Sequence, residues 1–265
     1  MSGCDTYLIL LAFVLGTCFG SFAGVLALRL PVGKSIIVSR SSCPVCEKRI
    51  KPYDLVPVIS FFLLKGKCRH CLAKISLMYP MVEFLCGLLF GTTMFLFDLP
   101  AVLPFAILAF ALVVVALVDM HVKEIPDSML VLMVAAAFFW IIFDPNSIRP
   151  LDAFIGAAAG ALPLFLLDKI TLFLIKKDGF GYGDVKLMGA AGLFLGWQGV
   201  LTMYFIAFIS GAIAAAYMLR AKKTERGGYI AFGPFICLGT ITAAWTNAFF
   251  GEHLTSFVIL TQHLT

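Results

Sequence analysis

The sequence predicts an all-α polytopic membrane protein with about eight transmembrane helices, and three observations lead to that fold class. Apolar residues make up 61% of the 265 positions and charged residues only 13%, whereas soluble domains are about half apolar and a quarter charged. The mean hydropathy is +1.00. The apolar residues form long runs, and the basic residues gather between alternate runs. This pattern excludes an ordinary soluble globule.

Eight apolar runs approach the ~20 residues that a helix needs to cross a bilayer. The sixth run is short, and the fourth is marginal for a full crossing. The expected spans are residues 7–28, 78–97, 101–118, 129–143, 151–167, 187–197, 200–219 and 230–250.

The distribution of Lys and Arg predicts how these spans are oriented. With the N-terminus outside, all of the 20 basic residues except Arg149 lie on the cytoplasmic side, as the positive-inside rule requires. Residues 29–77 alone carry ten of them. We therefore expect both termini on the outer side. The net charge of +5 implies no nucleic-acid partner, because basic residues in these places suit the topology and anionic lipid headgroups.

The first span, 7–28, is interpreted as a retained transmembrane helix. The N-terminal residues ahead of it include no basic residue and carry Asp5, and the apolar run is longer than the core of a signal peptide. Gly16 and Gly20 are small residues at helical spacing, which favours close packing against another helix. The helix is expected to end at Arg29-Leu30-Pro31, where Pro cannot continue it.

Two Cys-x2-Cys pairs stand between the first two spans. Cys43 and Cys46 form one pair, Cys68 and Cys71 form the other, and 21 residues separate the pairs, close to the spacing of a four-thiolate zinc ribbon. Zinc would stabilise a loop that is too small and too polar to form its own core. Two disulfides are the alternative, but the topology places this loop in a reducing compartment. We therefore predict a cytoplasmic zinc-ribbon-like loop with these four metal ligands.

The second span carries one acid, Glu83, just inside its cytoplasmic end. A carboxylate there is either a hydrogen-bond acceptor in helix packing or part of a polar site, and the sequence leaves both open. The expected organisation has three parts: 1–28 as the first transmembrane helix, 29–77 as the four-cysteine loop, and 78–265 as a transmembrane domain.

Two further acids are predicted to meet at one membrane face. Asp119 ends the third span and Asp184 begins the sixth, and the topology puts both at the cytoplasmic side. Such a pair can work as an aspartic-protease dyad, in which one ionised acid deprotonates a water while the other, protonated, donates to the scissile carbonyl. Asp127 competes for this role, but its place after Pro126 and before an apolar run fits an N-cap for the fourth span.

Asp184 closes a glycine-rich turn, residues 177–186. Glycine permits close approach of another backbone, so Gly181 and Gly183 are predicted to bind an extended peptide substrate beside the acid. The alternative is a flexible loop in which Asp184 only caps a helix. The last two spans contain no central charge and are interpreted as scaffold, with Gly233-Pro234 expected to bend the final helix.

Several of these segments together resemble one enzyme family. Gly20-Ser21-Phe22, Arg29-Leu30-Pro31, the cysteine pairs, Tyr79-Pro80 with Glu83, and Gly181-Tyr182-Gly183-Asp184 occur in the order found in bacterial type IV prepilin peptidases. These are bifunctional leader peptidases and N-methyltransferases of type IV pilus and type II secretion systems. The GxGD motif is also shared with presenilin-like intramembrane proteases. The sequence departs from many relatives at Gly24, where they have Asn, and at His121, where they have Asp.

The resemblance implies a function for the chain. It implies a peptidase domain in residues 78–265 that cuts the basic leader from prepilins and pseudopilins at the cytoplasmic face of the bacterial inner membrane, with Asp119 and Asp184 catalytic. It also implies N-methylation of the new N-terminal residue with S-adenosylmethionine as methyl donor, and it identifies no methyl-transfer residues.

Two other functions stay open at this point. A proton-coupled transporter would use Asp119 and Asp184 as a relay, although such sites tend to lie at the membrane midplane in repeated folds, and no repeat is evident. A zinc-ribbon scaffold without catalysis would leave the glycine turn and the facing acid unexplained.

Overall fold

A computed structural model of the chain describes residues 3–33, 41–176, 181–221 and 231–262. The described residues form seven long helices and two short ones, which lie in the loop between α1 and α3. The long helices are α1 (Gly3–Arg29), α3 (Met78–Leu96), α4 (Leu99–Val122), α5 (Asp127–Phe143), α6 (Pro150–Ile175), α7 (Tyr182–Arg220) and α8 (Gly233–Gln262). The short ones are η1 (Pro52–Leu55) and α2 (Ile59–Leu63).

The predicted fold class is confirmed. Among the described residues, five helices are long and apolar enough to cross a membrane, and α5 is apolar but shorter. The expected sixth and seventh spans form one element, α7, which is interrupted at Gly196. The backbone there has φ 62° and ψ 176°, a conformation that essentially only Gly adopts. The two helical stretches of α7 on either side of Gly196 correspond to the two expected spans.

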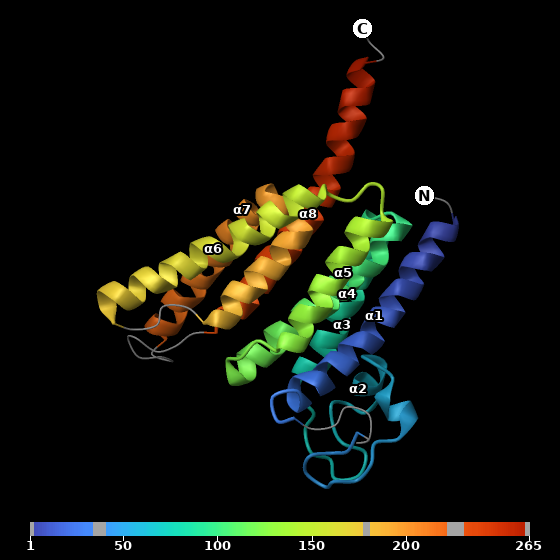
Figure 1. Cartoon of the computed structure of the whole chain (residues 1–265). Coiled ribbons are helices and arrows are strands. Elements are labelled where there is room, and N and C mark those ends of the chain that lie inside the picture. Colours follow the sequence, from blue (N-terminus) through green and yellow to red (C-terminus); the bar gives the residue numbers. More distant parts are fainter. Residues whose placement is uncertain (1–2, 34–40, 177–180, 222–230, 263–265) are drawn as a thin grey trace.

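Helix α4 is the centre of the molecule. Side chains on several of its faces are fully buried, including Leu108, Leu112 and Val114, and α1, α3, α5 and α8 all pack against it. A helix that is apolar on all sides belongs in such a position. Figure 1 shows α1, α3, α4 and α5 side by side, with α6, α7 and α8 as a second group.

Glycines lie at the closest contacts between helices, as was predicted from Gly16 and Gly20 in the first span. A Cβ atom on Gly20 would lie 2.6 Å from the Cα atom of Glu83, and one on Gly16 would lie 2.5 Å from the carbonyl oxygen of Cys86. Helices α1 and α3 therefore touch backbone to backbone near Glu83. Gly156 of α6 and Gly192 of α7 meet in the same way, which allows the second group to pack.

The cysteine loop lies at one end of the bundle, referred to below as the loop end. The start of α1 and the far end of α8 lie at the opposite end (Figure 1). The ends of α1 and α4 and the start of α3 converge at the loop end, where they line a common cavity. The start of α7 joins them there, since the Lys186 ammonium lies 2.9 Å from the Asp127 carboxylate at the start of α5.

Two details of the sequence interpretation are wrong. Asp127 is the first residue of α5 rather than its N-cap, which is Pro126, and it makes no capping hydrogen bond; its carboxylate pairs with Lys186 instead. Gly233-Pro234 begins α8 rather than bending it, because Pro is suited to the first turn of a helix, where its missing N–H has no partner to lose.

Candidate active site and metal centre

The four cysteines of the loop form a cluster with the geometry of a tetrahedral metal site. All four sulfur atoms lie within 4.8 Å of one another, and the Sγ atoms of Cys43 and Cys71 are 3.7 Å apart. Metal–sulfur bonds of ~2.3 Å at tetrahedral angles place sulfurs about 3.8 Å apart. The four thiols are not joined as disulfides. The loop thus has the ligands and the spacing to bind a metal ion.

The two cysteine pairs lie in two separate turns that have the same backbone geometry. The amide of Cys43 donates to the Lys48 carbonyl at 3.0 Å, and the amide of Cys68 donates to the Ala73 carbonyl at 2.8 Å. Glu47 and Leu72, one residue after each pair, have φ of 56° and 59°. Left-handed backbone at a non-glycine residue costs about 1–2 kcal/mol, so the turns need an interaction that offsets this strain. Metal binding by the thiolates supplies one.

Backbone amides favour the metal-binding form of Cys43. The N–H groups of Cys46 and Val45 lower the pKa of the Cys43 thiol to about 6, because hydrogen bonds to a thiolate stabilise the charged form. The thiolate, rather than the thiol, is the form that ligates a metal.

The loop is fixed by two carboxylates. Arg69 donates to both oxygens of Asp54, from Nη2 at 2.6 Å and from Nε at 2.9 Å, and this pairing holds the pKa of Asp54 below its usual value. Glu83 lies on α3, and its Oε2 accepts a hydrogen bond from the Val58 amide at 2.7 Å. The sequence left open an acceptor in helix packing or a part of a polar site; Glu83 is an acceptor, but its donor is a loop amide and not a neighbouring helix. It ties the loop to the second span.

Asp119 is a buried acid in the last turn of α4, with only 4% of its surface exposed. Its Oδ2 accepts a hydrogen bond from the backbone amide of Gly233 at 2.8 Å, and Gly233 is the first residue of α8. A Cβ atom at Gly233 would lie 2.6 Å from this oxygen. The partial positive charge of a helix N-terminus favours an anion here. Lys123 adds a second favourable charge interaction with Asp119.

Asp184 is buried to the same extent, at 5% exposure, in the first turn of α7. Its carboxylate accepts a hydrogen bond from the amide of Gly181, the N-cap residue of α7, as an acid three residues after an N-cap does. Asp184 therefore caps its own helix and also interacts electrostatically with Asp119. The buried thiol of Cys237 on α8 interacts with both acids. The start of α8 thus lies beside the pair.

The two glycines of the turn have ordinary backbone conformations. Gly181 has φ −73° and ψ 144°, and Gly183 does not have positive φ. A Cβ atom on Gly183 would lie 3.0 Å from the Cβ atom of Ile125, so one side of this glycine packs against the segment after α4. The first part of the predicted turn, residues 177–180, lies outside the described residues.

The sequence interpretation missed the part played by α8. Its start had been assigned to the scaffold, yet the Gly233 amide is a hydrogen-bond partner of Asp119 across 114 residues of sequence. The sequence did contain an indication of this contact. Gly-Pro ahead of an apolar run marks the N-terminus of a helix, and a helix N-terminus stabilises an anion. The sequence did not identify which acid would lie there.

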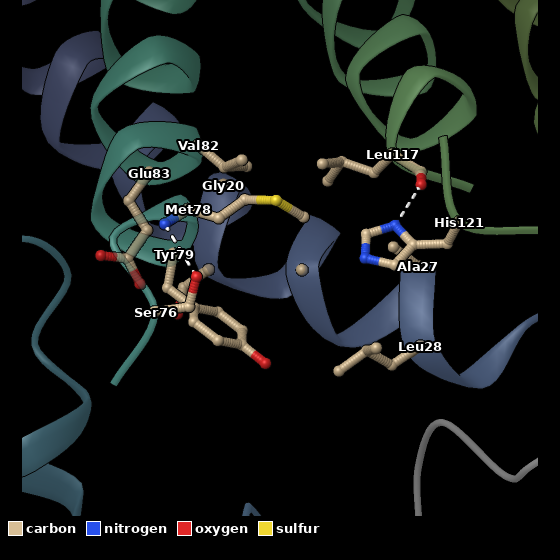
Figure 2. Close-up of a pocket in the computed structure, with 12 residues that line it drawn as sticks. Gly20, Ala27, Leu28, Ser76, Met78, Tyr79, Val82, Glu83, Leu117 and His121 are labelled. Atoms are coloured by element: carbon tan, nitrogen blue, oxygen red, sulfur yellow. Dashed lines mark hydrogen bonds between the residues drawn. The ribbon is translucent and has the colours of Figure 1, made fainter. Parts of the chain in front are cut away.

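Two adjoining cavities lie at the loop end. The larger, of about 540 Å³, lies between the cysteine loop and helices α1 and α3. The smaller, of about 200 Å³, is bounded by α1, α3 and α4; Figure 2 shows Tyr79 and Glu83 from α3 on one side of it and Leu117 and His121 from α4 on the other. In the wall of this cavity, the His121 ring makes a hydrogen bond with the Leu117 carbonyl oxygen, which lies 2.6 Å from Nδ1.

Two protein families match the chain. Residues 14–97 match the family described as Bacterial Peptidase A24 N-terminal domain, and residues 106–216 match the type IV leader peptidase family. The first match contains the cysteine loop and Glu83, and the second contains Asp119 and Asp184. No solved structure matches the chain significantly.

Curated relatives match over nearly the full chain. A protein of Bacillus subtilis is 32% identical over 93% of this chain and 96% of its own length. A protein of Stutzerimonas stutzeri is 30% identical over 94% of this chain and 92% of its own length. A protein of Neisseria gonorrhoeae is 31% identical over 88% of this chain and 89% of its own length. Each of the three is named prepilin leader peptidase/N-methyltransferase.

Proposed function

This chain belongs to the type IV leader peptidase family, and we propose that it cleaves the basic leader from type IV prepilins and pseudopilins and then methylates the new N-terminal residue. The observation that carries the peptidase function is the buried pair Asp119 and Asp184, which interact electrostatically beside the start of α8. The matched families and the names of the relatives support the same function. The transporter alternative finds no support in these relatives.

The two acids have different surroundings, and we assign their roles from that difference. Each acid accepts a hydrogen bond from a backbone amide, Gly233 for Asp119 and Gly181 for Asp184, but the charge of Lys123 acts on Asp119. The repulsion between the two carboxylates acts on both, so the pair holds one proton between them, and Lys123 favours Asp119 as the ionised member. Asp119 is then the general base that takes a proton from water, and Asp184 donates a hydrogen bond to the scissile carbonyl. Burial keeps bulk water away from both.

The substrate is an extended peptide whose basic leader stays on the cytoplasmic side. The leader lies along Gly181 and Gly183, and it approaches from the side away from Ile125, since Ile125 fills the other side of Gly183. The ten basic residues of segment 29–77 support a cytoplasmic location of the loop end. The termini are then periplasmic, and the protein is a multi-pass protein of the inner membrane.

Two non-protein groups complete the proposed function. Zinc is the metal that suits four thiolates at this spacing, and Cys43, Cys46, Cys68 and Cys71 would hold it as a structural ion that folds the loop. S-adenosylmethionine supplies the methyl group for the second reaction.

Replacing either acid by its amide tests the peptidase site. Asp119→Asn and Asp184→Asn are expected to lower cleavage of a purified prepilin in detergent by at least about 100-fold, because each removes a proton-transfer group. Asp127→Asn is the matched control, since this exposed acid makes only a surface ion pair with Lys186. Cleavage near the wild-type rate by either of the first two variants would show that the pair is not catalytic.

A further inference from the structure

The two cavities at the loop end adjoin each other. Both are lined by Ser21, Gly24, Leu28, Ser76, Tyr79 and Glu83. The larger cavity extends from there under the cysteine loop, and the smaller one extends to the end of α4. Residues from both matched families therefore line these adjoining cavities, and Glu83 is one of the residues that lie between them.

Glu83 is the only acid among the residues that line the smaller cavity. Asp54, which lines the larger one, is already paired with Arg69 through both oxygens. Glu83 uses Oε2 to accept the Val58 amide, and a carboxylate has four acceptor positions. Among the described residues, Glu83 is thus the carboxylate with capacity to bind a cationic group in this space.

The cavity and the acid pair lie on opposite faces of the same helix turn. Leu117 and His121 line the smaller cavity, and Asp119 lies two residues from each of them. Residues two apart on an α-helix point about 200° apart, and a helix with its side chains is about 10 Å thick. A peptide end freed at Asp119 has only to pass round the end of α4 to reach the cavity.

We propose that the larger cavity binds S-adenosylmethionine and that Glu83, at its boundary with the smaller cavity, binds the newly freed α-amino group of the processed pilin for methyl transfer. This inference rests on the proposed function. It assigns a site to the N-methylation reaction, which requires that the methyl donor and the amine bind next to each other. Glu83 then has two partners, the Val58 amide and the substrate amine.

The chemistry of the cavity fits this donor. Cys43 and Cys68 also line this cavity, so a metal held by the thiolates would lie at its wall, and the volume of about 540 Å³ is within the range of ordinary small-molecule sites, about 300–1,000 Å³. The rings of Phe61 and Tyr79 contribute to its wall and offer faces on which an adenine base can stack. Basic residues, including Arg49 and Lys74, also line it and can pair with the carboxylate of the donor.

The reaction at Glu83 balances in protons and charge. The α-ammonium of the pilin loses a proton to the Glu83 carboxylate, and the free nitrogen lone pair forms a bond to the sulfonium methyl carbon. The carbon–sulfur bond breaks, and its electron pair stays on sulfur, which leaves neutral S-adenosylhomocysteine. The methylated amine carries the positive charge, and Glu83 releases its proton to water.

Glu83→Gln tests the role of the carboxylate. The amide oxygen can still accept the Val58 N–H, so the zinc content and prepilin cleavage are expected to stay within about twofold of wild type. Methylation of the cleaved pilin, followed by mass spectrometry, is expected to fall by at least about 100-fold, while binding of S-adenosylmethionine measured by calorimetry persists. Glu47→Gln, on an exposed acid that does not line either cavity, is the matched control.

Gly24 tests the cavity itself. A Cβ atom there would lie 3.6 Å from the Tyr79 ring, an ordinary contact, so Gly24→Ala is expected to behave as wild type. Gly24→Trp fills the shared space and is expected to weaken S-adenosylmethionine binding at least tenfold and to reduce methylation in proportion, with cleavage retained.

The outcomes separate this inference from the proposed function. Methylation at the wild-type level in Glu83→Gln, or undiminished donor binding in Gly24→Trp, overturns the assigned site while cleavage by wild type still supports the peptidase. Loss of zinc together with both activities in Glu83→Gln also overturns it, because Glu83 would then act only through the fold of the loop. Absence of cleavage and methylation in the wild-type protein itself refutes the proposed function instead.

Discussion

A single backbone hydrogen bond connects Asp119 to the far end of the chain. The Gly233 amide donates to its Oδ2 at 2.8 Å, and the same amide begins α8. Asp184 has a similar partner, the Gly181 amide at the start of α7. Each acid is therefore oriented by the first turn of a helix, where unpaired N–H groups favour a negative charge.

Gly233→Ala is expected to impair cleavage without changing either acid. The added methyl carbon would lie 2.6 Å from Asp119 Oδ2, well inside normal contact distance, so the carboxylate or the start of α8 has to move. A displacement of about 1 Å at a catalytic group can cost about 100-fold in rate, and steady-state cleavage assays measure this loss.

The control for that variant is Gly91→Ala. A Cβ atom at Gly91 would have its nearest neighbour at 3.7 Å, so this substitution should leave both cleavage and thermal stability close to wild type. If Gly233→Ala protein cleaves prepilin as fast as Gly91→Ala protein does, the hydrogen bond to Asp119 has no positioning role.

At the scale of elements, we expect the cysteine loop to depend on a metal bound by its four thiolates. Among the described residues it contains only two isolated bridges, Ser42 with Arg49 and Lys67 with Lys74, and two short helices with no buried residue. A segment with so little buried apolar surface cannot offset the entropy of its own ordering. The thiolate cluster, the Asp54–Arg69 ion pair and the hydrogen bond from Val58 to Glu83 are the contacts that hold it.

Cys68→Ser is accordingly expected to release zinc and to expose the loop to proteolysis at Lys65, Lys67 and Arg69, because three thiolates bind the ion far less tightly than four. Limited trypsin digestion and metal analysis of the purified protein measure both effects. Cys18→Ser, at a thiol outside the cluster, is the control. A variant that keeps its loop intact after complete loss of metal would show that zinc does not stabilise the loop.

At the scale of the whole molecule, α4 separates the two proposed reaction sites. Its last turn presents Asp119 to α8 and presents Leu117 and His121 to the cavity against α1 and α3. The peptidase residues Asp119 and Asp184 lie on α4 and α7, while the proposed methyl-transfer residue, Glu83, lies on α3. One product can thus pass between two sites that share no catalytic residue.

The two activities should then be separable in one protein. Asp184→Asn protein, which is expected not to cleave, should still methylate a synthetic peptide that begins at the mature N-terminus of the pilin. Mass spectrometry of the peptide detects the added methyl group. Failure to methylate it, in protein that retains zinc and binds S-adenosylmethionine, would mean that the two reactions share Asp184.

Much of this molecule was predictable because membrane insertion restricts sequence strongly. A spanning helix needs a long apolar run, so the fold class and the approximate positions of the spans could be predicted, including two separate helical stretches on either side of Gly196. The four cysteines were recognisable for a similar reason, since metal ligands need a fixed spacing. The roles of Asp119 and Asp184 remain predictions that the amide variants test.

Sequence alone determined the fold class and which four cysteines could bind a metal, and it predicts that Asp119 and Asp184 belong at the same membrane face. Only the tertiary structure placed the Gly233 amide on Asp119 and connected Glu83 both to Val58 and to a cavity that reaches α4. The physical reason is that apolar runs and ligand spacings are local properties of the chain. Contacts between distant helices depend on how their surfaces pack, and a single sequence does not record that packing.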